Sequence, residues 1–164
     1  MRYILDKAKE ILDNYGGKNI FETAENSGAI VWERPLGGLK GFYLFENGFR
    51  YIVINEGLDK ITKEVVCAHE LGHDVLHREL SEGGIREKTL FLSSNKTERE
   101  ANLFAAEVLI SDEDILDEIA DHNSINALCA AIGLPKGIVD FKIEILNYKG
   151  YHFNSGGSAS DFLK

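Results

Sequence analysis

The sequence has few cysteines, few basic residues for its acidic content, and no long apolar run. Its 164 residues include two cysteines, Cys67 and Cys129, which form no disulfide-framework pattern, so we expect free, buried thiols. The 18 basic against 27 acidic residues give a formal charge of -9, which argues against direct binding to nucleic-acid phosphates. No run approaches the ~18 apolar residues of a membrane span, and the N-terminus does not resemble a signal peptide. We therefore expect a cytoplasmic protein without membrane contact.

The composition is that of an ordinary globular protein, with 44% apolar and 27% charged residues. A chain of this length typically forms one domain, which buries roughly 70% of the surface of its unfolded form. No internal repeat or linker divides the sequence, so we predict a single domain over residues 1–164. Its end, about 154–164, has the small and polar composition of a flexible tail.

Segments typical of strands come before most of the predicted helices. Apolar spacing predicts an amphipathic helix from Arg2 to Asn14, and a short helix is expected around Asn19 to Asn26. Aromatic and β-branched residues predict three strands, with Asn47-Gly48 as a hairpin turn: Ile30–Glu33, Leu39–Phe45 and Phe49–Asn55. Helices are expected at about 63–79, 96–110, 112–120, 124–132 and 136–147. This order predicts an α+β fold, in which a small antiparallel or mixed sheet packs against a bundle of helices.

The segment "AHELGHDVLH", residues 68–77, carries the strongest chemical signal in the chain. His69 and His73 are spaced i, i+4, so on a helix they lie on one face and can share a tetrahedral metal ion. Glu70 lies beside that face, where the glutamate of zinc hydrolases with this pattern accepts a proton from water. Gly72 costs a helix about 1 kcal/mol relative to alanine, so we expect another element to pack closely there.

A catalytic zinc ion commonly has three protein ligands, so a third must come from outside this pair. His77 continues the i+4 series, but its side chain is rotated by about 80° from that of His69, which disfavours it as a ligand. The segment "NKTEREANLFAAEVLI" offers Glu98 and Glu100 near the start of a helix, with Glu98 on the apolar face. Alternatively, Asn95 caps this helix, Glu98 closes a capping box, and Glu100 is merely solvated.

Taken together, "HELGHDVLH" and "EREANLFAAEVLI" resemble the ImmA/IrrE family of zinc metallopeptidases. Members of that family join an HExGHxxLH stretch to a downstream ExxAN/DxFA helix. The resemblance covers nearly the whole chain, from the N-terminal helical pair through the strand ending in "IVIN" to the helix in "IGLPKGIVDFKIEIL". The chain departs from the family after "FAAEVLI", where Ser111-Asp112 stands in place of a frequent proline.

Carried over by position, the resemblance implies four central roles: zinc (Zn2+) ligands His69, His73 and Glu98, and the catalytic base Glu70. Glu100 is the fallback for the third ligand. Asn102, four residues after Glu98, can accept the distal N–H of a ligand imidazole and so orient it. The resemblance further implies a gluzincin-type endopeptidase with the HExxH helix at its centre. Its protein substrate would typically be a helix-turn-helix transcriptional repressor linked to a mobile element or a stress response.

A competing hypothesis is a zinc-stabilised protein that relieves repression by binding the repressor without cutting it. The presence of Glu70 and the lack of an obvious fourth ligand favour the enzyme. The ligand count discriminates, because three protein ligands plus water indicate a catalytic site and four indicate a structural one.

Two C-terminal features have alternative interpretations. Residues 126–146 resemble two helices joined by a glycine-containing turn, as in helix-turn-helix DNA binding, but the second helix has few basic residues, and we expect it to pack in the core. Tyr148, Tyr151 and His152 are candidates for stabilising an oxyanion, although surface or packing roles are favoured.

The strand "FRYIVIN", Phe49–Asn55, is the last predicted strand before the histidine helix. We expect it to lie at the edge of the sheet and to pair with an extended substrate, so that proline at Val53 or Asn55 would harm binding. If the strand is interior, proline there would instead unfold the protein.

Overall fold

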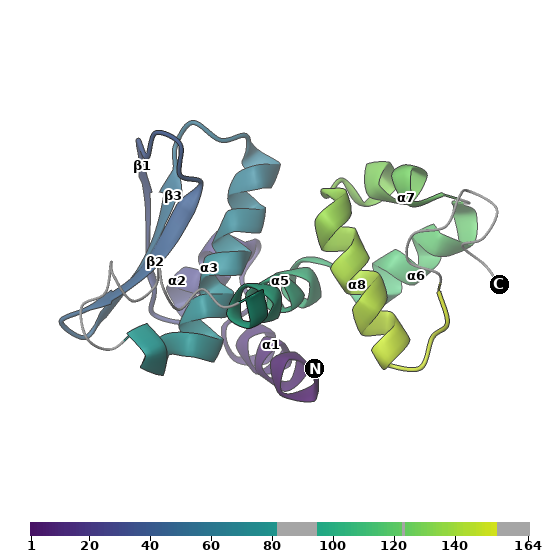
Figure 1. The fold of residues 1–164 in the computed structure, drawn as a ribbon, viewed down its shortest axis with the longest axis horizontal. Helices are drawn as coiled ribbons and strands as arrows, with labels where there is room; N and C mark the ends of the chain where they lie inside the picture. Colours follow the sequence, from purple (N-terminus) through teal and green to yellow (C-terminus); the bar gives the residue numbers. More distant parts are fainter. Residues whose placement is uncertain (82–94, 123, 154–164) are drawn as a thin grey trace.

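The computed structural model describes residues 1–81, 95–122 and 124–153, which form seven helices and one three-stranded sheet (Figure 1). The elements in chain order are α1 (Arg2–Tyr15), α2 (Ile20–Asn26), β1 (Ile30–Arg34), β2 (Gly41–Glu46), β3 (Phe49–Asn55), α3 (Lys60–Ser81), α5 (Asn95–Leu109), α6 (Asp112–Asp121), α7 (Ile125–Ile132) and α8 (Lys136–Tyr148). The predicted α+β fold is confirmed, with each predicted element close to its expected position. The predicted tail at residues 154–164 and the side chain of Asn95 lie outside the described residues.

The sheet is mixed, with strand order β1-β3-β2. β2 and β3 are antiparallel and joined by Asn47-Gly48, whose φ angles of 52° and 81° are those the predicted tight turn requires. β1 runs parallel to β3, with Ile30 opposite Tyr51. The mixed form of the predicted sheet is therefore correct, and the purely antiparallel form is wrong.

The prediction that β3 lies at the edge of the sheet is wrong. Val53 pairs with Trp32 of β1 on one side and with Phe42 of β2 on the other. Asn55 is also paired with a residue of β1. The physical reason is burial, because Ile52 and Ile54 are fully buried and belong at the centre of the sheet. Proline at Val53 or Asn55 would therefore test the folding of the sheet and not substrate binding. The edge strand on the side opposite β1 is β2.

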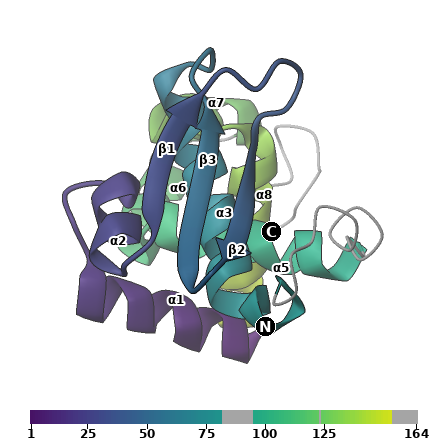
Figure 2. The same ribbon diagram turned by 90° about the vertical axis from the view of Figure 1, so that its left-hand side faces the viewer.

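Helix α3 covers one face of the sheet. In Figure 2 the sheet faces the viewer and the helix lies behind it. Ile52 and Ile54 share a buried cluster with Leu71 of α3. The predicted close approach at Gly72 is confirmed, because a Cβ there would lie 3.1 Å from Ala101 Cα and 3.2 Å from Phe104 Cδ1 of α5. Gly72 thus allows α5 to pack directly against the histidine helix.

Helices α6, α7 and α8 lie on the side of α5 opposite the sheet (Figure 1). The predicted core packing of the last helix is confirmed, since its apolar residues are buried: Ile138, Val139, Ile143 and Ile145. Ser111 begins α6 as its N-cap and accepts a hydrogen bond of 3.0 Å from the Asp114 N–H. The chain therefore turns here through a serine cap in place of the family's frequent proline.

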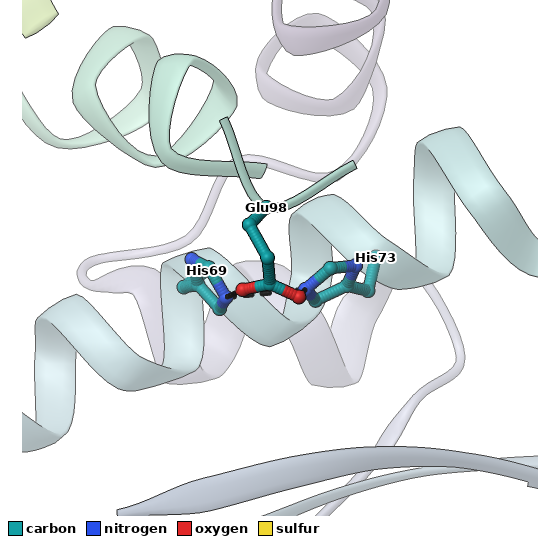
Figure 3. A group of neighbouring side chains, drawn as sticks. All are labelled: His69, His73 and Glu98. Carbon is teal, nitrogen blue, oxygen red and sulfur yellow. Dashed lines mark hydrogen bonds and ion pairs between the residues drawn. The ribbon is translucent and has the colours of Figure 1, made fainter. Parts of the chain in front are cut away.

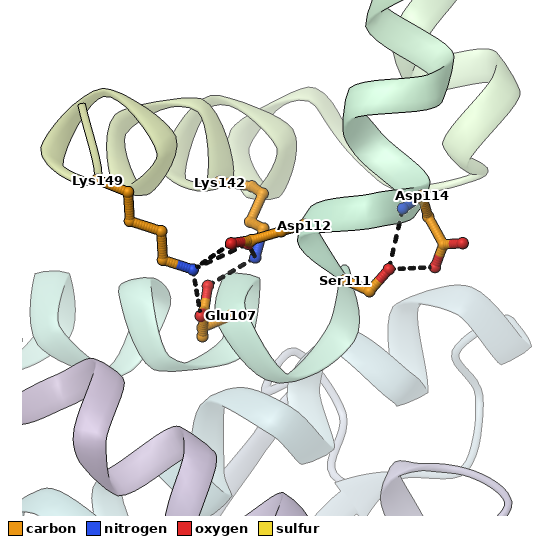
Figure 4. Close-up of polar contacts among 6 residues, drawn as sticks. All are labelled: Glu107, Ser111, Asp112, Asp114, Lys142 and Lys149. Carbon is orange, nitrogen blue, oxygen red and sulfur yellow. Dashed lines mark hydrogen bonds and ion pairs between the residues drawn. The ribbon is translucent and has the colours of Figure 1, made fainter. Parts of the chain in front are cut away.

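Two lysines of α8 hold this helix to α5 and α6 through an ion cluster (Figure 4). Lys142 Nζ lies 2.6 Å from both Glu107 Oε2 and Asp112 Oδ1, and Lys149 Nζ lies 2.7 Å from the other oxygen of each. Lys142 is only 1% exposed, and these two carboxylates are the partners that a buried ammonium group requires.

Both cysteines are free, with Cys67 buried and Cys129 half-buried. Among the described residues, no helix is long and apolar enough to cross a membrane.

Candidate metal centre

Helix α3 places His69 and His73 one turn apart on the same face, and the first turn of α5 directs Glu98 between them (Figure 3). The two Nε2 atoms are 3.1 Å apart. Glu98 Oε2 lies 3.3 Å from Nε2 of His69, and Oε1 lies 3.4 Å from Nε2 of His73. The structure thus brings together the three residues that the sequence singled out as ligands.

One ligand atom from each of these residues lies within 4.8 Å of the other two, a spacing that a shared metal ion can bridge. Ligand bonds of about 2.0–2.1 Å at tetrahedral angles separate the ligand atoms by about 3.3–3.4 Å. The set of two imidazoles and one carboxylate suits a zinc ion, and within the described ranges the group has three members. The residues present therefore fit a three-ligand site of the catalytic type.

A hydrogen bond to α5 orients the ring of His69. Asn102 Oδ1 lies 2.9 Å from His69 Nδ1, the contact expected of Asn102 from its spacing to Glu98. The side-chain oxygen accepts from an Nδ1–H, which leaves Nε2 unprotonated and free to bind a metal.

His77 and Glu100, the two weaker candidates, stand outside the ligand group. Glu100 Oε2 lies 2.9 Å from His77 Nε2, and His77 Nδ1 lies 3.3 Å from His73 Nδ1. The structure therefore brings Glu98 to the histidines, and pairs Glu100 with His77.

Glu70 belongs to α3, its side chain faces β2, and the residue is 9% exposed. A Cβ at Gly41 of β2 would lie 2.4 Å from Val66 Cγ1 and 3.8 Å from Glu70 Cγ, so β2 packs closely against the side of α3 that carries Glu70. Burial, and then the charge of Glu98, raise the pKa of Glu70 to about 8, against the opposing hydrogen bond of the Tyr43 main chain. A carboxyl with a pKa raised toward neutrality is suited to taking up and releasing a proton.

The surroundings of His73 favour the neutral form of its imidazole. Burial, followed by the neighbouring rings of His69 and His77, lowers the pKa of His73 to about 3. Metal ligation requires the neutral imidazole, so this environment already favours the binding form.

A buried carboxylate one residue after His73 fixes the sheet to α3. Asp74 is fully buried and accepts hydrogen bonds from Tyr43 Oη at 2.8 Å, Arg50 Nη1 at 2.9 Å and Arg78 Nε at 3.0 Å. Burial, and then the Asp74 charge, raise the pKa of Tyr43 well above its ordinary value of 10.

Sequence reasoning missed this Asp74 group, although a signal was present. In β3 the side chain of Arg50 points to the same face as Ile52 and Ile54, because alternate residues share a face. A guanidinium on a buried face requires an acidic partner.

The three candidates for oxyanion stabilisation, Tyr148, Tyr151 and His152, are exposed. The rings of Tyr151 and Phe153 stack at 5.8 Å, the Tyr151 N–H donates to Leu146 O, and Tyr148 is exposed at the end of α8. These contacts fit the packing and surface roles that were favoured for them.

An α+β fold that directs two histidines and a glutamate to one point, beside a buried glutamate, defines a metallopeptidase-like protein. The model of a peptidase family, described as the IrrE N-terminal-like domain, matches residues 24–144, and the chain belongs to this family of metallopeptidases. The matched range includes every residue of the candidate centre, and the predicted family resemblance is confirmed.

Two curated relatives extend over most of the chain. The chain is 37% identical over 138 residues to uncharacterized immunity region protein 2 of Bacillus phage phi105, covering 76% of this chain and 86% of the relative. It is 27% identical over 145 residues to Metallopeptidase ImmA of Bacillus subtilis (strain 168), covering 85% of this chain and 83% of that protein.

Proposed function

We propose that this protein is a zinc-dependent endopeptidase whose substrate is a helix-turn-helix transcriptional repressor. The observation that carries the proposal is the convergence of His69, His73 and Glu98, whose ligand atoms lie within 4.8 Å of one another, beside the buried Glu70. The names of the two relatives, a metallopeptidase and a phage immunity region protein, support a peptidase that acts on the control of a mobile element.

In this proposal His69, His73 and Glu98 hold the zinc ion, and Glu70 moves the proton. When bound, zinc supplies Lewis-acid polarisation of the scissile carbonyl and acidifies water. Glu70 accepts a proton from the water whose oxygen bonds to the carbonyl carbon. It then gives this proton to the amide nitrogen, which leaves as an amine when the C–N bond breaks.

Within the described part of the chain the outer edge of β2 is unpaired, and in this proposal it holds an extended substrate. Asn55 N–H donates to Lys40 O at 2.8 Å, so the alternation of an antiparallel pair assigns the β3-facing hydrogen bonds to Phe42 and Leu44. The N–H groups of Gly41, Tyr43 and Phe45 then face outward, and that of Tyr43 faces Glu70. A substrate strand added to this edge would lie beside the proposed base.

The test is incubation of the purified protein with candidate repressors encoded in the same genome, with zinc or with a chelator. We expect a specific cut that the chelator abolishes and added zinc restores. The competing function, binding without cleavage, predicts a stable complex of intact repressor under all conditions, and that outcome would overturn the proposed activity.

A further inference from the structure

We propose that His77 and Glu100 are positioning residues, which form a hydrogen-bonded chain that orients His73 for metal binding. The inference rests on the metal site of the proposed function. It assigns a role to two residues outside the ligand group: His77 contacts the second ligand histidine, and Glu100 contacts His77.

The three side chains form a continuous chain with one consistent arrangement of protons. His73 directs Nε2 toward His69 and Glu98, which leaves Nδ1 as its protonated nitrogen when Nε2 binds a metal. This Nδ1–H faces His77 Nδ1 at 3.3 Å, so His77 accepts there and carries its own proton on Nε2. Its Nε2–H then donates to Glu100 Oε2 at 2.9 Å.

The surroundings of the chain hold it in this arrangement. The His77 side chain is 10% exposed, so its polar atoms need partners within the protein. Lys96 Nζ lies 3.9 Å from the other oxygen of Glu100, so one carboxylate oxygen faces Lys96 and the other contacts His77.

Helix α5 thereby anchors the Nδ1 atoms of both ligand histidines. Asn102 contacts His69 directly, and Glu100 contacts His73 through His77. Since α5 also supplies Glu98, the same helix sets the third ligand and the ring orientation of the other two.

The test is the zinc affinity of matched variants, measured by competition with a chromophoric chelator. His77→Leu removes the acceptor but keeps a side chain of similar bulk, whereas the smaller His77→Asn places an amide oxygen near the position of Nδ1. We expect His77→Leu to weaken zinc binding about 10- to 100-fold, the range for outer partners of metal ligands, and His77→Asn to recover most of this loss. Glu100→Leu should weaken binding and Glu100→Gln should largely preserve it, because a glutamine oxygen still accepts from His77.

His122→Leu is the matched control, because His122 also contacts a glutamate, Glu118, but at the end of α6. It should leave zinc affinity unchanged. Equal affinities for His77→Leu and His77→Asn would show that no hydrogen bond to His73 is involved, and would overturn the inference.

A measurement on the unmodified protein covers the case in which a variant does not fold. In the zinc-loaded protein labelled with 15N-histidine, long-range NMR correlations should show His73 protonated on Nδ1 and His77 protonated on Nε2. A proton on His77 Nδ1, or zinc bound to His77, would contradict the chain. Neither test uses a substrate, so an uncut repressor with these results would overturn only the proposed activity, and failure of the wild-type protein to bind zinc would overturn both.

Discussion

Glu98 and Glu100 are two residues apart on α5 but contact different atoms. Glu98 places one oxygen near each ligand Nε2, whereas Glu100 contacts His77. We predict that Glu98→Gln weakens zinc binding by more than about 100-fold, beyond the usual effect of an outer partner, while Glu100→Gln changes it far less. The measurement is zinc affinity by competition, with metal content after purification as the check. The reverse order of the two variants would show that Glu100 is the ligand.

The residues of the site differ in how far their roles can be predicted from sequence. His69, Glu70 and His73 belong to one helical turn, where local spacing determines which side chains share a face. The roles of Glu100 and His77 depend on how α5 crosses α3, which no local pattern specifies. Both residues were therefore recognised as polar candidates near the metal, but not as partners of each other.

At the scale of elements, the crossing of α3 and α5 depends on the lack of a side chain at Gly72. Alanine there would place a Cβ 3.1 Å from Ala101 Cα, so the helices would have to separate slightly. We predict that Gly72→Ala lowers the free energy of unfolding by about 1–3 kcal/mol, the usual cost of overpacking. Gly137→Ala in α8 is the control, because nothing lies within 4 Å of its added Cβ and alanine should stabilise the helix by about 0.5–1 kcal/mol.

Both variants are compared by urea unfolding and zinc affinity. A Gly72→Ala protein that gains as much stability as Gly137→Ala would show that the close approach is not required.

The edge of β2 gives a second prediction at this scale. The Phe45 N–H faces outward, so proline at this position removes a donor for substrate while the hydrogen bonds of Phe42 and Leu44 to β3 remain. Phe45→Pro should slow repressor cleavage more than Phe45→Ala, which controls for loss of the ring. Circular dichroism and zinc content establish that both variants are folded. Equal cleavage rates for the two variants would exclude pairing with the Phe45 N–H.

The helices and strands could be located from sequence because each follows its own apolar period, and Asn47-Gly48 specified the hairpin. The order of the strands within the sheet could not be predicted in this way. β1 pairs with β3, although β2 lies between them in the sequence. This long-range pairing places β3 at the centre of the sheet, where Ile52 and Ile54 are buried. Position in the sequence was therefore a poor guide to which strand forms the edge.

For the molecule as a whole, the ion cluster of Lys142, Lys149, Glu107 and Asp112 joins α8 to α5 and α6. Lys142→Met leaves two partly buried carboxylates with one lysine, and we predict a loss of about 3 kcal/mol in the free energy of unfolding. Lys136→Met is the control on the same helix, because its exposed pair with Asp140 is worth about 0–1 kcal/mol.

The pH dependence of this loss tests its electrostatic origin. Burial alone would raise the pKa of Asp112, but hydrogen bonds from Lys142 and Lys149 outweigh it and hold this pKa below its ordinary value of 3.8. The stabilisation that ionised Asp112 contributes is therefore complete above pH 3.8, its ordinary pKa. It is lost as the pH falls through the lower pKa that Asp112 has in the folded protein. The difference between wild type and Lys142→Met should shrink over that range, whereas a difference independent of pH would indicate packing alone. Glu107 and Lys142 are 35 positions apart, so sequence periodicity had no means of pairing them.

The most direct test of the central claim is the initial rate of repressor cleavage by wild-type protein and by Glu70→Gln, each carrying the same measured amount of zinc. Glutamine keeps the shape of the buried side chain but does not accept the proton from water. We predict that Glu70→Gln keeps its fold and its zinc and loses at least about 100-fold in rate, the low end for general acid–base catalysis. A zinc-loaded Glu70→Gln protein that cuts the repressor at the wild-type rate would show that Glu70 is not the base and would contradict the account.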